Sequence, residues 1–296
     1  MLTISNNALK ISVHAPDNEN GYYRGTRFDR AGVFESIVYR GCNYCEPWFE
    51  SYSPIMHDAV CGPAEEFSPI GLEGTEAGDP FLKIGVGVLE RLDNEPYDRF
   101  RLHRILEEGE RKTETGKDFI RLTHRIDSET GYGYEYVKEI VLTSEHSFAI
   151  RHCLKNIGRK VLKGDVYNHN FFTLGLLQTG PSRTIDFPFQ PEGDWRAEYS
   201  EVGFTGSGIR FSRALKKGES VFTGNIHQAG RGLDGSPNAF VLSEQQTGRG
   251  VKMYCATPMT RTVFWSNHRI ACLEPYIDFD IRPGEILDFE INYILA

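Results

Sequence analysis

Residues 167–174, Tyr-Asn-His-Asn-Phe-Phe-Thr-Leu, are the stretch that indicates the fold most directly. They place His169 between the amides of Asn168 and Asn170, in a segment whose aromatic residues favour a β-strand. A polar group among such residues must find a partner on folding or wait for a ligand, because burying it unpaired is costly. The segment therefore predicts a strand that also carries candidate binding groups.

Alternation of apolar and polar residues continues along most of the chain, whereas helical periodicity is hard to find. Upstream, Phe148, Ile150 and Leu154 fall on one face of a strand, with Arg151 and Lys155 on the other. Further strands are expected at residues 33–39, 81–92, 119–126, 134–142, 251–254 and 286–295. Glycine-containing turn signals separate several of them, for example at 114–117 and 128–131. Many short strands joined by such turns predict an all-β, antiparallel sandwich or barrel.

Two segments interrupt this pattern of strands and turns. Residues 42–76 and 180–194 are rich in Pro, Gly and aromatic residues, and long irregular loops in compact proteins are usually functional. No linker separates one part of the chain from another. All-β domains often reach a length of 296 residues undivided, so we expect residues 1–296 to form one domain.

Composition limits the classes of partner and compartment. A formal net charge of −8 argues against a nucleic-acid partner and gives no reason to expect binding to an anionic membrane. The N-terminal residues lack the basic and apolar regions of a signal peptide, and no apolar run approaches the length of a membrane span. Six irregularly spaced cysteines do not form a secreted disulfide framework. We therefore expect a cytoplasmic protein with reduced thiols.

The segment at 167–174 and the Asn-Ile-Gly turn at 156–158 resemble the aldose 1-epimerase (galactose mutarotase-like) family. In that family, an Asn- and Gly-containing turn precedes Asn-His-x-Tyr/Phe-Phe-Asn-Leu, whose histidine is the acid. A second match lies about a hundred residues later, where Cys-Leu-Glu-Pro at 272–275 precedes Arg-Pro-Gly-Glu at 282–285. The resemblance is clearest from about residue 148 onward. It implies a large antiparallel β-sandwich, the galactose mutarotase-like supersandwich, with His169 as acid and Glu274 as base.

The chemistry of such an enzyme explains why these two residue types are needed. Interconversion of anomers requires the C1 hydroxyl to lose a proton while the ring oxygen gains one, after which the ring opens and closes on its other face. A carboxylate suits the first role and an imidazolium the second. Reference pKa values of ~4.3 for Glu and ~6.5 for His put both groups in these forms between those values. The reaction requires no metal, nucleotide or covalent intermediate, so we expect no cofactor and a small-molecule sugar as the partner.

The resemblance also suggests sugar-binding residues. Thr26-Arg27 stands where the family has an Asn-Arg pair, and a guanidinium offers several donors to neighbouring hydroxyls. Arg24 is a further candidate, with an ion pair to Asp29 or Glu35 as the ordinary alternative for both arginines. His57 lies about as far beyond Arg27 as a second histidine does in the family.

Three further observations concern the candidate site. Asn168, beside the predicted acid, and Trp48, in an apparent loop, are also candidate contacts, the latter as a platform for a sugar ring. The adjacent acids Glu65 and Glu66 could hydrogen-bond sugar hydroxyls, but consecutive acids on a loop are more often solvated. Pro237 stands where the family has a sugar-binding Asp, so that contact is absent or supplied elsewhere.

Several alternatives remain open. Cys42-x-x-Cys45 supplies half of a zinc site, but the second half is missing, so buried free thiols are the simpler interpretation. A non-catalytic sugar-binding protein of the same fold is the main alternative function. A hexose-6-phosphate 1-epimerase is another, with Arg24, Arg27 and Arg30 as the nearest basic cluster. The identity of the sugar, its phosphorylation, its attachment to an oligosaccharide and the oligomeric state of the protein are not determined by the sequence.

Overall fold

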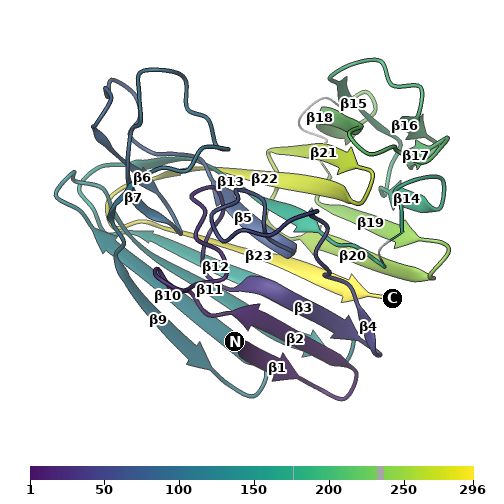
Figure 1. Cartoon of the computed structure of the whole chain (residues 1–296), viewed down its shortest axis with the longest axis horizontal. Helices are drawn as coiled ribbons and strands as arrows, with labels where there is room; N and C mark the ends of the chain where they lie inside the picture. Colours follow the sequence, from purple (N-terminus) through teal and green to yellow (C-terminus); the bar gives the residue numbers. More distant parts are fainter. Residues whose placement is uncertain (176, 232–236) are drawn as a thin grey trace.

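A computed structural model of the chain describes residues 1–175, 177–231 and 237–296, and within these ranges all regular structure is β-strand (Figure 1). The strands form four antiparallel sheets. The first has the order β1-β2-β3-β4, with bounds Leu2–Ser5, Leu9–His14, Val33–Tyr39 and Cys42–Asn43. A small sheet, β6-β7-β8, has the bounds Pro80–Lys83, Gly87–Glu90 and Ile105–Glu107.

Two large sheets contain the remaining strands. The ten-stranded sheet has the order β16-β17-β14-β19-β20-β23-β12-β11-β10-β9, with bounds Val202–Thr205, Gly208–Phe211, Arg183–Asp186, Ala239–Glu244, Arg249–Cys255, Ile286–Leu295, Ser147–Asn156, Gly133–Ser144, Phe119–Asp127 and Glu110–Thr115. The six-stranded sheet has the order β15-β18-β21-β22-β13-β5, with bounds Pro191–Trp195, Ser220–Gln228, Arg261–Asn267, Ala271–Ile281, Leu162–Phe171 and Gly62–Phe67. The predicted all-β antiparallel sandwich is therefore confirmed.

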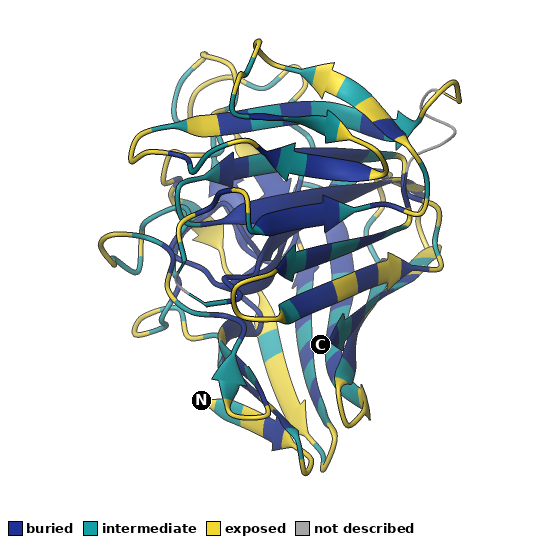
Figure 2. Ribbon diagram, turned by 90° about the vertical axis from the view of Figure 1, so that its right-hand side faces the viewer, coloured by how far each residue is buried: buried dark blue, intermediate teal, exposed yellow. Residues whose placement is uncertain are grey.

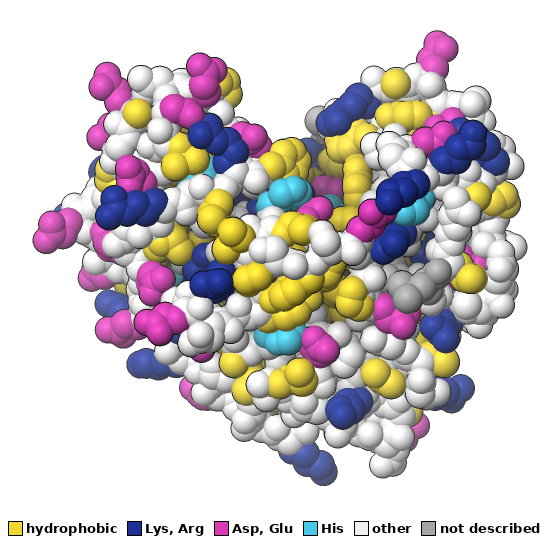
Figure 3. All heavy atoms as spheres, viewed as in Figure 1, with side chains coloured by type: hydrophobic (Ala, Val, Ile, Leu, Met, Phe, Trp, Pro, Cys, Tyr) yellow, Lys and Arg dark blue, Asp and Glu magenta, His cyan; other side chains and the backbone are white. Residues whose placement is uncertain are grey.

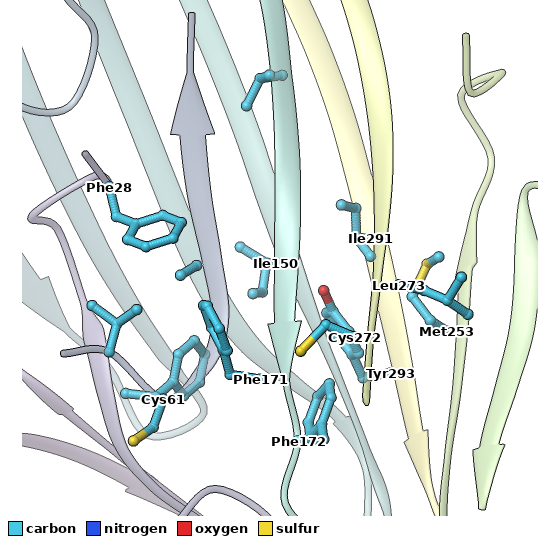
Figure 4. Close-up of a cluster of buried hydrophobic side chains, with 14 of the residues drawn as sticks. Phe28, Cys61, Ile150, Phe171, Phe172, Met253, Cys272, Leu273, Ile291 and Tyr293 are labelled. Atoms are coloured by element: carbon cyan, nitrogen blue, oxygen red, sulfur yellow. The ribbon is translucent and has the colours of Figure 1, made fainter. Parts of the chain in front are cut away.

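The two large sheets face each other across one hydrophobic core. Ile150 and Ile291 of the ten-stranded sheet and Leu273 of β22 belong to the same cluster of buried side chains, part of which Figure 4 shows. Figure 2 shows buried residues along these strands and exposed residues at many of the connecting turns. In β13, the consecutive residues 166–171 are all buried. Neighbouring residues of a strand point to opposite faces, so both faces of this part of β13 are covered.

A buried polar cluster joins the two sheets within this core. The Asn168 amide on β13 donates a hydrogen bond of 2.9 Å to Glu65 Oε1 on β5. The ammonium of Lys138, on β11, pairs with the Glu65 carboxylate and lies 3.6 Å from Asp29 Oδ2. It also donates to the carbonyl of Ala31 at 3.0 Å. Because each buried charge has an opposite charge beside it, the cluster fixes β5 and β13 against the ten-stranded sheet.

Most predicted strands are confirmed, and three predictions need correction. The stretch 81–92 is a hairpin of β6 and β7 rather than one strand, because Gly85 has φ +79° and a Cβ there would lie 2.6 Å from a carboxylate oxygen of Asp29. The segment 42–76 contains β4 and β5, and the segment 180–194 contains β14 and most of β15, so neither is wholly irregular. Within the described ranges, no helix has the length and apolar character that crossing a membrane requires.

Candidate active site

The register of two neighbouring strands brings the predicted acid and base together. Strand β13 pairs with β22 so that Tyr167 lies opposite Tyr276. Two residues after Tyr167 is His169, and two residues before Tyr276 is Glu274, so the antiparallel strands place both side chains on the same face and at the same level. His169 Nε2 lies 3.2 Å from Glu274 Oε1, and both residues are buried. The two candidate catalytic groups thus form one polar pair on the sheet.

The pair lines a cavity of about 550 Å³ on the face of the six-stranded sheet that is turned away from the ten-stranded sheet. Figure 3 shows this region as a hollow between the part of the molecule that carries β6 and β7 and the part that carries β14 to β18. Aromatic and hydrogen-bonding side chains line the cavity: Arg27, Trp48, His57, Asp58, Arg99, Phe100, His169, Phe171, Arg196, Phe222, Trp265, Glu274 and Tyr276. Such a mixture is typical of a small-molecule site, in which a few polar groups orient the ligand.

Burial shifts the pKa values of Glu274 and His169 in opposite directions. Burial raises the pKa of Glu274 to about 7, against the opposing effect of Arg27. Burial lowers the pKa of His169 well below its usual value, and the nearby Arg27 and Arg99 lower it further. The order of the two pKa values is therefore inverted relative to free Glu and His, so the reference values used in the sequence analysis do not apply to the buried pair. As the pH falls through about 7 the pair takes up one proton, which burial favours on the carboxyl group of Glu274, 3.2 Å from the imidazole.

Aromatic rings fix the orientation of the His169 imidazole. It stacks on Phe171 with ring centroids 3.7 Å apart and an interplanar angle of 9°, and Trp265 meets it edge-on at 5.7 Å. Its Nδ1 atom is buried without a hydrogen-bond partner among the described residues. Nε2 is thus the nitrogen that faces the carboxyl group of Glu274.

Arg27 belongs to a charged network beside the pair. Its Nε donates to Glu66 Oε2 at 2.8 Å, and its Nη2 donates to the hydroxyl of Tyr167 at 3.0 Å. Arg99 and Lys83 also pair with Glu66, each at 3.4 Å. Although burial alone raises it, these three cations lower the pKa of Glu66 to about 2. The carboxylate therefore stays ionised and holds Arg27 in place at the wall of the cavity.

Two further predicted contacts, His57 and Trp48, also line the cavity. The His57 ring lies 4.9 Å from that of Phe100, and its backbone carbonyl accepts a hydrogen bond of 3.0 Å from the hydroxyl of Tyr23. The indole of Trp48 stacks on Phe171 at 5.0 Å and donates from Nε1 to a backbone carbonyl at 2.9 Å. Both side chains are therefore positioned by packing before any ligand arrives.

Asn168 and Arg24 do not line the cavity. Asn168 faces the opposite side of β13 from His169, where it bonds Glu65, because alternate residues of a strand point to opposite faces. Arg24 lies outside the lining, and its backbone carbonyl accepts a hydrogen bond from Arg30. The ion pair suggested for Arg24 is also replaced, since Asp29 pairs with Lys138. The structure therefore places both residues outside the lining of the cavity.

Several residues of the site were missed from the sequence. Tyr276 could have been found, because it follows Glu274 by two residues and so shares its face of the strand. The same spacing relates Tyr167 to His169. Arg99 and Arg196 had no such signal, because they lie outside the strands and reach the cavity only through the path of the chain.

The sequence suggested that the adjacent acids Glu65 and Glu66 are solvated. In the structure they are buried, with 0% and 2% of their surface exposed. They lie on β5, so one points between the sheets to Lys138 and the other toward Arg27. Because consecutive residues of a strand point to opposite faces, each buried carboxylate pairs with its own cations. On a solvated loop, water would take the place of these cations.

Two other sequence features lie outside the cavity. Pro237 is buried, and its carbonyl accepts a bond of 3.4 Å from the hydroxyl of Thr262; the preceding Gly235 and Ser236 lie outside the described residues. Buried Cys45 has its thiol beside that of Cys61. In the described part of the chain, no group of three or more His, Cys, Asp and Glu side chains is arranged to hold a metal ion.

Comparison with known proteins gives a likeness in structure only. No protein-family model matches the chain, and no curated protein does. A galactose mutarotase-like protein from Lactobacillus casei covers 100% of both chains with a TM-score of 0.60 at 11% identity. A galactose mutarotase-like protein from Clostridium acetobutylicum covers 99% of this chain and 94% of its own, with a TM-score of 0.59 at 12% identity. The GalM/aldose epimerase homologue from Caenorhabditis elegans covers 100% and 98%, with a TM-score of 0.56 at 11% identity.

These likenesses extend over essentially the whole chain, although the sequence identity is only 11%. At such low identity they show the fold and not the reaction. The chain has the galactose mutarotase-like fold, as its resemblance to the aldose 1-epimerases implied.

Proposed function

We propose that this protein is an aldose 1-epimerase-like enzyme that interconverts the α and β anomers of an aldose. The observation that carries the proposal is the 3.2 Å contact between His169 Nε2 and Glu274 Oε1 at the wall of a cavity. The cavity volume of about 550 Å³ lies in the range of small-molecule sites. The fold, shared with solved proteins named as mutarotase-like, supports the same function.

The geometry suits the two proton transfers of the reaction. The C1 hydroxyl oxygen and the ring oxygen are bonded to the same carbon, so the base and the acid must stand close together. The Glu274 carboxylate takes the hydroxyl proton, and the His169 imidazolium donates its proton to the ring oxygen as the C1–O5 bond breaks. The open-chain aldehyde rotates about C1–C2, and the reverse transfers close the ring on its other face. Both groups then return to their starting forms.

The shared proton sets the state in which the enzyme works. Because the pKa of Glu274 is raised and that of His169 is lowered, the free pair carries one proton over the acidic side of neutrality. A sugar that places one oxygen beside each group selects the form with a carboxylate and an imidazolium. That form contains the same number of protons as a neutral acid beside a neutral imidazole, so no proton has to enter the cavity from solvent.

Arg27 is proposed to bind hydroxyls of the sugar. It is 8% exposed, lines the cavity and is held by Glu66 and Tyr167 at 2.8 and 3.0 Å. A guanidinium fixed in this way donates without losing much side-chain entropy. Its charge also helps to keep the neighbouring Glu274 ionised, because it lowers the pKa of that carboxyl.

The test is anomer exchange, measured by NMR exchange spectroscopy on a panel of aldoses, with the variant Glu274→Gln. The amide keeps the shape of the side chain but cannot accept the proton, so exchange should fall by ~10²–10⁴-fold while sugar binding and the melting temperature change little. Glu290→Gln, which alters an exposed pair with Arg151 on the ten-stranded sheet, is the matched control. Equal exchange rates for the parent and Glu274→Gln would reject this function.

A hexose-6-phosphate 1-epimerase is a second candidate. The arginines that support it differ in part from those suggested by the sequence. Arg99 and Arg196 line the cavity, whereas Arg24 and Arg30 do not. The side chain of Arg99 is 41% exposed, and Arg196 lies over the ring of Phe222 at 4.1 Å with no ion pair among the described residues. Guanidinium groups bind phosphate strongly through paired hydrogen bonds.

Exchange of a hexose and its 6-phosphate under the same conditions separates the two candidates. If the substrate is phosphorylated, kcat/KM should be higher for the phosphate, and Arg196→Ala should remove that advantage while exchange of the neutral hexose is kept. A parent enzyme that treats both sugars alike would argue for the neutral aldose.

The non-catalytic sugar-binding protein remains the alternative from another class. It would bind sugars without accelerating exchange, and its affinity would not depend on the proton shared by His169 and Glu274. A cytoplasmic location and a small-molecule sugar as the partner belong to the same proposal.

A further inference from the structure

The candidate active site is not the only cavity on this side of the molecule. A second cavity, of about 480 Å³, shares three lining residues with it: Trp48, Asp58 and Trp265. The two cavities meet at Trp265, whose indole lies edge-on to the His169 imidazole at 5.7 Å. The second cavity therefore begins directly beside the proposed reaction centre.

The lining of the second cavity combines aromatic surface with hydrogen-bonding groups. Trp48, Phe49 and Trp265 supply the aromatic surface. Asn267 and His268, at the end of β21, supply polar groups at its edge. A sugar ring has apolar C–H faces and a rim of hydroxyls, so aromatic faces and polar side chains together fit its two kinds of surface.

The aromatic wall is fixed without a ligand. The Arg269 guanidinium donates to the backbone carbonyls of Trp48 and Phe49 at 3.3 and 3.2 Å. At the edge of the cavity, Lys217 Nζ lies 2.8 Å from Glu50 Oε2, which links the turn before β18 to the segment that carries Trp48. Because Arg269 already holds the backbone that carries Trp48 and Phe49, a ligand that binds there loses little of its binding energy to ordering this segment.

We propose that the second cavity binds the sugar unit next to the reducing end, so that the substrate class is a reducing oligosaccharide rather than a free monosaccharide. This inference rests on the proposed function. The reducing unit occupies the cavity of His169 and Glu274, and the adjoining unit lies against Trp265 and Phe49. Each cavity alone has the volume of a small-ligand site, so one aldose leaves the second cavity unused.

The test compares anomer exchange of glucose with that of glucose disaccharides whose linkages differ: sophorose, laminaribiose, cellobiose, maltose and gentiobiose. For at least one linkage, kcat/KM should exceed that of glucose by about tenfold, the scale of one aromatic stacking contact. Phe49→Ala should remove most of this advantage and leave glucose exchange unchanged, since Phe49 does not line the catalytic cavity. Tyr254→Ala, which alters a 39% exposed aromatic residue on β20, is the matched control.

Three outcomes overturn the inference: no disaccharide surpasses glucose, Phe49→Ala affects glucose and disaccharides equally, or the control variant has the same effect as Phe49→Ala. If the parent exchanges no sugar at all, the proposed reaction fails separately. Calorimetric titration with the same disaccharides then decides: binding that is weakened by Phe49→Ala supports the second sugar site, and absence of binding rejects it.

Discussion

The shared proton of His169 and Glu274 makes a quantitative prediction about pH. The proposed reaction needs one proton on the pair, and that proton is lost as the pH rises through the Glu274 pKa of about 7. Going from pH 6 to pH 8, the fraction of enzyme with the proton falls from about nine-tenths to about one-tenth. We therefore expect kcat/KM, which reports the free enzyme, to fall by roughly tenfold over this interval.

The assay is NMR exchange between anomers at low sugar concentration, with the exchange in buffer alone measured at each pH and subtracted. A catalysed rate that is constant or rises from pH 6 to pH 8 would refute the reasoning.

A charge variant tests the cause of the titration. Arg99 lowers the pKa of Glu274, so Arg99→Met should raise that pKa and move the descending limb of the profile to higher pH. Arg121→Met is the matched control, because Arg121 has the same side-chain exposure of 41% but pairs with Glu139 on the ten-stranded sheet. If both variants, or neither, shifted the limb, the descending limb would not report the proton of the His169–Glu274 pair.

Three further outcomes are expected. His169→Asn should lower anomer exchange by ~10²–10⁴-fold at every pH, since the amide cannot donate a proton to the ring oxygen; an active variant would assign that role to another acid. Arg27→Ala should raise the KM for the sugar more than it lowers kcat, and an unchanged KM would remove Arg27 from the site. Lys138→Met should lower the free energy of unfolding by ~3–5 kcal/mol in denaturant titrations, because it leaves Glu65 and Asp29 buried without their cation; a change below ~1 kcal/mol would contradict this.

The strands were predictable where one face is buried and the other meets water. In β12, Phe148, Ile150 and Leu154 are fully buried while Arg151 and Lys155 are exposed, as the alternation indicated. The prediction failed for β5, whose residues are all buried. When both faces of a strand are covered by other parts of the chain, its residues do not alternate between apolar and polar, so the sequence shows no strand pattern. The hairpin at 81–92 was likewise hidden, because its turn depends on the positive φ of Gly85.

In the candidate site, too, some residues could be predicted from the sequence and others could not. His169 and Glu274 were identified from two short motifs, and the strand register then brought them into contact. Tyr276 was within reach of the same reasoning, since it shares the face of Glu274. Arg99 and Arg196 were not, because they reach the cavity from segments between strands, where spacing along the chain carries no information about direction.

The sequence by itself determined the all-β class and the strand that carries His169, and its resemblance to the aldose 1-epimerases singled out His169 and Glu274 as the candidate acid and base. These follow from local alternation and from motifs of a few residues. Only the tertiary structure decided that Asn168 faces the core, that Glu66 holds Arg27, and that the pKa values of the pair are inverted. The physical reason is that burial and electrostatic environment are sums over groups distant in sequence, and those groups become neighbours only when the sheets pack.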